Sequence, residues 1–526
     1  MKSKYDKYTS LMILLVFIFF SIKVAWLSDD GYITITAAKH LAEGNGLTTN
    51  VGERVQSFTN PLLALIYSGL FFIFKEYYYT PMFFDLFCSY AAIFILSKYF
   101  KDKSKLLCIM PLFVWSRSFI DFSSSGLENS LIHLLFSIFL IYRCKDNKNL
   151  IIEAFISCLL VFSRMDMCII LLPILCYDYL NFKKYTKKQI FVNIGKGIIG
   201  YIPFLCWCVF ALIYYGFIFP NTFYSKLYSG ISQIYYLKNG LIYYFYSICY
   251  DPILIVIFIL LLYLLLIKRS KIQKDSLCIL LGVVFYYLYI IKIGGDFMCG
   301  RYLSFTFCPL LFVMMNELNI YKKQIYSFLL TFCSIFCISF FTAHMYEDCS
   351  ISSSPLYIVN ERSCYSWSNL FFRFDSDGLN NFKKIHTYFS KTYNEDIDSY
   401  ISHPVITIGM VGCFDENNSY IIDKVGLSNV LLARLPYENI LLGQSFNRFR
   451  PGHVTRIIPD GYIESVKTNS NKIKDEYLND YYDKVIILTR SPIFSKERFK
   501  VILNFNLGKY DYLINKYIQD YAYSKL

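Results

Sequence analysis

Long apolar runs alternate with short polar loops over the first two thirds of the chain. Twelve such runs can be recognised, at residues 8–27, 61–74, 82–97, 106–120, 129–142, 149–163, 167–181, 190–215, 252–267, 276–293, 302–318 and 325–343. Many approach the roughly 20 apolar residues that a helix needs to cross the hydrocarbon core of a bilayer. The pattern predicts a multi-spanning α-helical membrane protein.

The run 61–74 decides the topology. If this run crossed the membrane, the Lys-rich loop 98–105 would lie outside, and every later Lys-rich loop would change sides with it. If the run lies in the membrane interface instead, all basic loops fall on one side, which the positive-inside rule makes the cytoplasmic side. We therefore expect 11 transmembrane helices, a cytoplasmic N-terminus and a C-terminus outside the cell.

Composition agrees with this prediction, and charge adds to it. The 526 residues are 55% apolar and carry a formal net charge of +13. Residues 344–526 hold 21 Lys and Arg and 21 Asp and Glu, so the whole positive excess belongs to residues 1–343. The excess is a topology signal rather than a site for a polyanion, and we expect no nucleic-acid partner.

The composition changes near residue 343. Beyond it, mixed polar sequence surrounds short strand-like runs at 405–409 and 484–488, separated by Gly, Asn and Asp. We expect a transmembrane catalytic domain at 1–343 and an extracytoplasmic domain of α/β or mostly β structure at 344–526. Most Cys residues lie in apolar runs and resemble small hydrophobic residues, while a disulfide between Cys349 and Cys364 stays open.

The loop 28–74 carries the first candidate chemistry. Asp29 and Asp30 open it, a helix-compatible run follows at 32–43, and Gly44-Asn45-Gly46 then predicts a stop. A carboxylate pair just outside the hydrocarbon is well placed to act as a general base at a membrane surface. The alternative is that Asp30 only caps the short helix.

Other ionisable residues fall on the same outer face. They are Glu128, Arg164, Asp166, Lys226, Asp296 and Arg301. Ionisable groups at a membrane boundary are functional candidates. Each also has a structural alternative: a helix-dipole partner for Glu128, ion pairs for the Arg–Asp couples, and a snorkelling side chain for Lys226.

A turn-rich segment of the tail concentrates cations and a histidine. Arg450, His453 and Arg456 lie in the stretch 450–462, which also contains two Pro and two Gly residues. Such a group suits a phosphate or a sugar. The alternative is an ordinary solvated loop.

In chain order, these segments resemble a known family. The loop reads DDGYI, LAEG, GERV and TNP, and later segments read SGLE, R-x-D, PNT-x-Y-x-K, GGDFM-x-GR, I-V-x-ER, D-x-x-GL, AR-L and GH-x-x-R-x-x-PDGY. Together they resemble the mycobacterial terminal β-(1→2)-arabinofuranosyltransferase family of GT-C membrane glycosyltransferases. Met165 stands where that family often has Pro, Asn360 where it often has Asp, and Cys364 where an aromatic residue is usual, departures that bear on the acceptor.

The resemblance implies a multi-pass enzyme of the bacterial plasma membrane. It would move a sugar, arabinofuranose or another pentose, from a polyprenyl-phosphate donor to a glycan or glycoconjugate on the outer face. An inverting transfer would use Asp29, or else Asp30, as general base. Lys226 and Arg301, with His453 and Arg456 as second candidates, would bind the donor phosphate. The sugar pocket or its support would comprise Glu128, Arg164, Asp166, Asn221, Tyr224, Asp296, Glu361 and Arg362.

The sequence leaves open whether the protein binds a metal ion and whether it is an enzyme. A divalent cation between carboxylates is compatible with the chain, but no motif fixes its ligands. No G-x-G-x-x-G or G-x-x-x-x-G-K-[ST] motif occurs in a suitable context, as expected for a lipid-phosphate rather than a nucleotide donor. The alternatives to an enzyme are a transporter or flippase of lipid-linked saccharides and a non-catalytic glycan-assembly protein. The domain at 344–526 is a candidate carbohydrate-binding domain.

Overall fold

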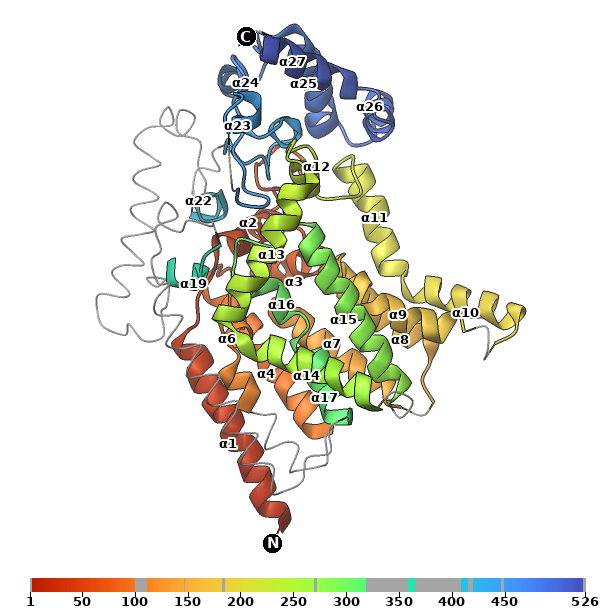
Figure 1. Ribbon diagram of the computed structural model, residues 1–526. Helices are drawn as coiled ribbons and strands as arrows, with labels where there is room; N and C mark the ends of the chain where they lie inside the picture. Colours follow the sequence, from red (N-terminus) through yellow and green to blue (C-terminus); the bar gives the residue numbers. More distant parts are fainter. Residues whose placement is uncertain are drawn as a thin grey trace. The chain divides into compact units, whose positions relative to one another are not determined.

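The computed structural model describes residues 2–99, 111–145, 147–181, 185–268, 272–317, 358–364, 408–414, 420–445 and 449–523, and these are mainly helical (Figure 1). The chain forms two compact units. Unit 1 comprises Met1–Ser28, Tyr78–Phe204 and Tyr236–Gly378, and unit 2 comprises Asp29–Tyr77, Leu205–Tyr235 and Leu379–Leu526. The opening loop from Asp29 therefore belongs to the same unit as the part of the tail from Leu379 onward.

Unit 1 is a bundle of apolar helices. Its helices are α1 (Lys2–Lys23), α4 (Tyr79–Tyr99), α6 (Arg117–Asp121), α7 (Asn129–Arg143), α8 (Leu150–Ser163), α9 (Met167–Tyr179), α10 (Lys187–Gly200), most of α13 (Gln233–Tyr250), α14 (Pro252–Lys268), α15 (Lys274–Lys292), α16 (Arg301–Ser304), α17 (Phe307–Glu317) and α19 (Glu361–Cys364). Helix α4 packs on α7, α9 on α15, and α8 on α10. A Cβ atom on Gly282 would lie 2.0 Å from the carbonyl oxygen of Ile170, so glycine lets α15 approach α9 closely.

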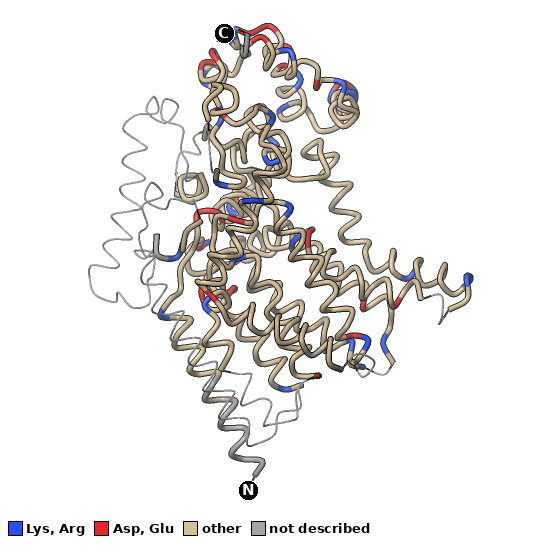
Figure 2. Tube along the Cα trace, in the orientation of Figure 1, with Lys and Arg blue, Asp and Glu red and all other residues tan. Residues whose placement is uncertain are grey.

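A few helices are long and apolar enough to cross a membrane. Among the described residues these are α4 and α15, and the bent pairs α10 with α11 (Ile202–Tyr214) and α13 with α14 raise the total to four if each pair is one span. Charged positions are sparse along α14 and α15 and lie at the helix ends (Figure 2). Helices α7, α8 and α9 have 13 to 15 residues. At about 1.5 Å per residue they are shorter than the hydrocarbon core, so the expected 11 spans are not confirmed.

Unit 2 combines the opening loop with the tail. Its helices are α2 (Asp29–Ala42), α3 (Pro61–Phe74), most of α11, α12 (Asn221–Leu227), α22 (Ile408–Phe414), the 3₁₀ turn η3 (Leu432–Arg434), α23 (Glu438–Leu441), α24 (Tyr462–Thr468), α25 (Glu476–Arg490), α26 (Lys496–Asn506) and α27 (Asp511–Tyr523). Helix α2 packs on α3 and α22, and α25 packs on α26 and α27. The predicted short helix and the predicted separate helix at 61–74 are both present.

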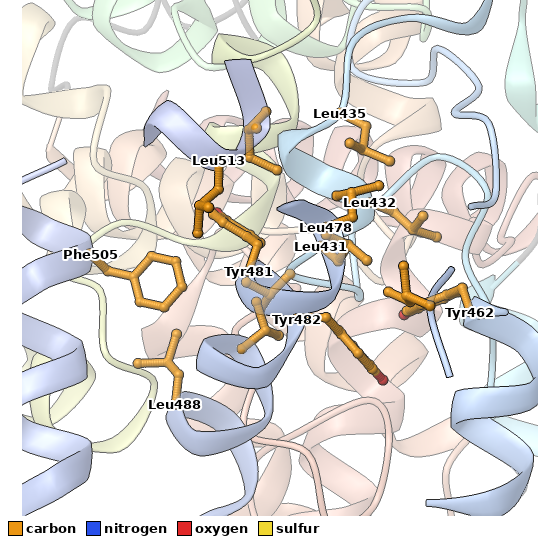
Figure 3. Packing of buried hydrophobic residues seen from close by; sticks show 14 of the residues in the cluster. Leu431, Leu432, Leu435, Tyr462, Leu478, Tyr481, Tyr482, Leu488, Phe505 and Leu513 are labelled. Carbon is orange, nitrogen blue, oxygen red and sulfur yellow. The ribbon is translucent and has the colours of Figure 1, made fainter. Parts of the chain in front are cut away.

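The tail has a helical core rather than the expected sheet. Leu478, Tyr481, Tyr482, Val485 and Leu488 all point from α25 into one apolar cluster (Figure 3). The strand-like run 484–488 lies inside this helix, and the described end of the run 405–409 begins α22. Because its apolar residues recur every three or four positions, α25 buries one face as an amphipathic helix does.

No strand occurs among the described residues of the tail, so its predicted α/β or mostly β fold is not confirmed. One isolated bridge pairs Met298 with Val359 in unit 1. The apolar run 325–343, the domain boundary at 343 and Cys349 lie outside the described residues. The boundary and the disulfide to Cys364 stay predictions.

Candidate functional site

Asp29 is a buried carboxylate at the start of α2. Its side chain accepts a hydrogen bond of 2.8 Å from the backbone N–H of Met410 in α22. A Cβ atom on Gly409 would lie 2.0 Å from the carbonyl oxygen of Asp29, so glycine allows the two helices to meet here. Burial raises the pKa of Asp29 to about 7, although the N–H groups of Met410 and Gly409 and the charge of Arg450 act against that rise.

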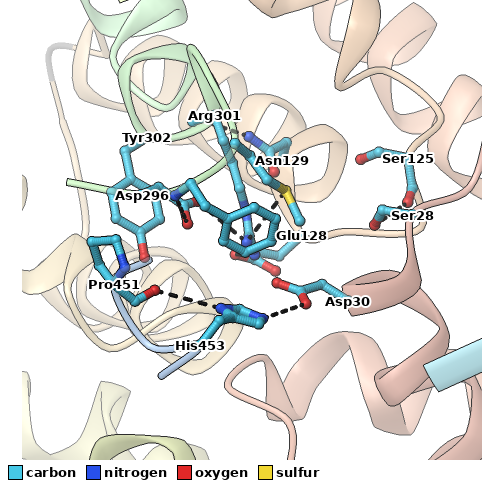
Figure 4. A network of polar contacts seen from close by, with 12 residues as sticks. Ser28, Asp30, Ser125, Glu128, Asn129, Asp296, Arg301, Tyr302, Pro451 and His453 are labelled. Atoms are coloured by element: carbon cyan, nitrogen blue, oxygen red, sulfur yellow. Dashed lines mark hydrogen bonds and ion pairs between the residues drawn. The ribbon is translucent and has the colours of Figure 1, made fainter. Parts of the chain in front are cut away.

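Asp30 is more exposed and faces the tail. One of its carboxylate oxygens lies 3.4 Å from Nε2 of His453 (Figure 4). The other ring nitrogen, Nδ1, lies 3.5 Å from the carbonyl oxygen of Pro451. A carbonyl oxygen can only accept a hydrogen bond, not donate one. The ring of His453 therefore donates toward Pro451 and presents its second nitrogen to the Asp30 carboxylate.

Lys226 belongs to the same part of unit 2. A Cβ atom on Gly452 would lie 2.6 Å from Cε of Lys226, so this lysine stem crosses the turn beside His453. Gly452 has a φ of +77°, a left-handed conformation that glycine adopts without strain. The turn thus brings a lysine of α12 beside the segment that holds His453.

The other predicted residues of unit 2 hold its loops in place. Asn221 donates from Nδ2 to the carbonyl oxygens of Gly426 and Leu427, at 2.9 and 3.1 Å. Arg456 is fully buried and donates to the carbonyl oxygen of Ser225 at 2.6 Å. The ring of Tyr224 packs 5.0 Å from Phe217 in the core. These three side chains contact other parts of unit 2, and their assignment to a ligand site stays a prediction.

Unit 1 holds a second polar cluster, centred on Glu128. This residue precedes α7, as the sequence predicted, and its buried carboxylate pairs with Arg164 and, at 3.3 Å, with Arg301. Figure 4 shows Glu128 and Asp296 turned toward Arg301, with 3.4 Å between Arg301 and Asp296. Burial raises the pKa of Glu128, but the charges of Arg301 and Arg164 outweigh burial and hold that pKa below its usual value.

The ion-pair alternatives of the sequence are thereby confirmed as contacts. Arg164 donates to Asp166 at 2.8 Å, where α8 ends and α9 begins. Together with the pairing of Arg301 and Asp296, these contacts balance both guanidinium charges with carboxylates. Arg301 consequently offers a phosphate less net positive charge than its sequence position suggested.

Sequence reasoning missed the residue that fixes this turn. Asp85 of α4 is fully buried and accepts hydrogen bonds of 2.9 Å from the N–H of Gly126 and the hydroxyl of Ser130. These bonds hold the backbone on both sides of Glu128. A lone carboxylate inside the apolar run 82–97 was the available signal, because such a residue is costly unless it has partners.

A third group surrounds Asp121, which sequence reasoning also missed. Nε of Arg362 lies 3.0 Å from one carboxylate oxygen of Asp121, and the hydroxyl of Tyr250 donates to the second oxygen of that carboxylate. Glu361 is buried at the start of α19. The predicted Arg362 is thus a partner of an acidic side chain in unit 1.

The candidates therefore fall into two groups. Unit 2 contains Asp29, Asp30, Asn221, Tyr224, Lys226, His453 and Arg456, and unit 1 contains Glu128, Arg164, Asp166, Asp296, Arg301, Glu361 and Arg362. Within unit 2, Asp30 from the opening loop meets His453 from the tail. Among the described residues, no group of three or more His, Cys, Asp and Glu side chains is arranged to hold a metal ion.

Comparisons with protein-family models, with curated proteins and with solved structures found no match to this chain.

Proposed function

We propose that the protein is a polyprenyl-phosphate-dependent glycosyltransferase that moves a sugar, arabinofuranose or another pentose, to a cell-surface glycan or glycoconjugate. The observation that carries the proposal is the grouping of Asp29, Asp30 and His453, residues far apart in the chain, with the cation Lys226 in one compact unit. A base for the acceptor and a positive charge for a phosphate are the two needs of such a transfer.

Asp29 acts as the general base in this proposal. Its carboxylate takes the proton of an acceptor hydroxyl as that oxygen forms a bond to the anomeric carbon. The bond from the anomeric carbon to the phosphate oxygen breaks, and its electron pair leaves with polyprenyl phosphate, so the configuration inverts. A pKa of about 7 suits this role, because a general base is most effective when its pKa lies near the working pH.

Lys226 and His453 would meet the charge of the leaving group. The phosphodiester of the donor becomes a dianionic monoester, so cations near it stabilise the transition state. His453 already pairs with Asp30, which orients the ring. Asp30 is then a positioning residue within unit 2.

The membrane placement is part of the same proposal. We place the N-terminus in the cytoplasm and the tail outside the bacterial plasma membrane, with 11 spans in all. The Lys-rich loops support this orientation. The carboxylates of α2 would then face the outer leaflet, where a lipid-linked sugar donor is accessible.

The test uses purified full-length protein, a synthetic polyprenyl-phosphoryl pentose and an oligosaccharide acceptor. Asp29→Asn keeps an oxygen that accepts the Met410 N–H but cannot take a proton, so we expect turnover to fall by about 10²–10⁴-fold while the protein stays folded. Asp460→Asn is the matched control, because this acid has a side chain 84% exposed.

The results of this assay distinguish Asp29 from Asp30 as the base, and an enzyme from a flippase. Loss of turnover in Asp30→Asn but not in Asp29→Asn would move the base to Asp30. Wild-type rates in both variants would overturn the base assignment. Absence of product from the wild type, together with movement of the intact sugar lipid across vesicles, would replace the enzyme by a flippase.

A further inference from the structure

One face of α26 is apolar and exposed, although this helix belongs to the polar tail. Phe499, Leu503 and Leu507 recur every four residues and are 41%, 58% and 60% exposed. Phe494, just before the helix, is 79% exposed. The opposite face of α26 is buried in the tail core through Val501, Ile502 and Phe505, so the exposed stripe is additional to the face that folds the domain.

Lysines border this stripe. Lys496 and Lys500 lie on α26 and Lys509 follows it, and all three are exposed. A helix with aromatic and aliphatic residues on one side and lysines beside them is the pattern of an element that lies in a membrane interface. Lysine stems cover apolar surface while their ammonium groups reach lipid phosphates.

The position of α26 supports the same partner. Arg498 is fully buried and donates to the carbonyl oxygens of Ile213 and Tyr214, at 2.6 and 2.7 Å. Asn506 donates to the carbonyl oxygen of Gly216 at 2.8 Å. Both ends of α26 are thus bonded to the backbone at the end of α11 (Figure 1).

Helices α10 and α11 together are long and apolar enough to form one membrane span, broken by a bend of 58°, or a re-entrant loop. Leu205, Val209 and Phe210 are exposed on α11, as expected for side chains that face lipid. Tyr214 ends it, and aromatic residues of this kind are enriched where a span leaves the hydrocarbon.

We propose that α26 lies on the membrane surface, with Phe499, Leu503 and Leu507 inserted at the boundary between headgroups and acyl chains. An element held to the end of a span lies at the level of the interface. The lysines would favour anionic headgroups. The tail would then be anchored at the membrane surface, whatever reaction the protein catalyses.

Photo-cross-linking of the full-length protein in nanodiscs tests this surface. Leu503 is replaced by benzoylphenylalanine, and the matched control places the same group at Thr468, an exposed polar position of α24. We expect a lipid adduct, detected by mass spectrometry, at Leu503 and little at Thr468. Yield should be higher with phosphatidylglycerol than with phosphatidylcholine alone, and K496Q with K500Q should remove that difference.

Two results would overturn the proposal. Equal lipid adducts at both positions would show no preference for this face. A covalent dimer from Leu503 without lipid adduct would assign the stripe to contact between two copies of the chain. Folding of each labelled protein is checked by its thermal unfolding, which should be unchanged because the replaced side chain is exposed.

Discussion

At the scale of single residues, Asp29 combines two roles that conflict. Its carboxylate caps the backbone of α22, which favours the charged form, while burial disfavours that form and raises its pKa to about 7. An unfolded aspartate titrates near 3.9. The folded protein therefore carries a penalty that is absent below about pH 4, develops as the pH rises, and is complete above about pH 7. A group that stores such a penalty is a candidate for function.

The first prediction concerns this penalty. Asp29→Asn should raise the free energy of unfolding at pH 8 relative to the wild type and change it little at pH 4. Since one pKa unit corresponds to about 1.4 kcal/mol, the gain is at most on the order of 4 kcal/mol. Chemical denaturation of both proteins at the two pH values measures it. A gain that is the same at both pH values would contradict the raised pKa.

Lys226 gives a second prediction at this scale. Lys226→Gln removes a cation assigned to the leaving phosphate but keeps much of the stem that crosses Gly452. We expect a loss of about 2–4 kcal/mol in transition-state stabilisation, on the scale of a lost oxyanion donor. The measurement is kcat/KM for transfer, with Lys472→Gln, an exposed lysine of the tail, as control. Equal values for both variants would remove Lys226 from the phosphate site.

Glu128 gives a third prediction, about stability. Glu128→Gln leaves Arg164 and Arg301 buried with less compensating charge, and breaking a buried ion pair in this way typically costs about 3–5 kcal/mol. We expect a lower melting temperature for unit 1. Asp460→Asn breaks the exposed contact to Lys474, 4.0 Å long, and should leave the melting temperature unchanged. Unchanged melting in both variants would mean that the Glu128 cluster adds no stability.

At the scale of elements, the contact between α2 and α22 links the base to the tail. The backbones are close because position 409 has no side chain. Because α22 packs this closely, the N–H of Met410 can hold the carboxylate of Asp29 in one orientation. The geometry of the base therefore depends on a glycine in a segment far away in sequence.

Two glycine substitutions test that dependence. Gly409→Ala introduces a Cβ 2.0 Å from the carbonyl oxygen of Asp29, so the helices must separate, and overpacking of this kind costs about 1–3 kcal/mol. Gly69→Ala in α3 meets nothing within 4 Å and should stabilise its helix slightly. We expect lost transfer activity and stability in the first variant only. Full activity in Gly409→Ala would show that α22 does not position Asp29.

At the scale of the whole molecule, the apolar pattern predicted helices that depend mainly on neighbouring residues. It placed the helix at 61–74 and the short helix after Asp29 correctly, since both depend on neighbouring residues. The run 484–488 was assigned wrongly because its four apolar residues, three of them β-branched, fit a strand as well as a helix. The spacing of Tyr481, Val485 and Leu488 favoured the helix that forms.

Sequence alone could not predict the non-local contacts. The bond between Asp29 and Met410 joins residues 381 positions apart, and no local pattern encodes it. The grouping of the opening loop with the tail follows from such contacts, whereas the sequence suggested a cut near residue 343. Motif residues such as Asn221 and Arg456 stay predicted site residues, and the structure gives them carbonyl partners that the motifs did not reveal.

The most direct test of the proposed reaction is the pH dependence of kcat/KM for transfer by the purified protein. If Asp29 is the base, the rate should rise tenfold per pH unit on the acid side and level off above an apparent pKa near 7. Asp29→Asn should lack this rise. A wild-type rate that is already constant between pH 5 and 8 would contradict the account, because a base with the buried environment of Asp29 is not fully ionised over that range.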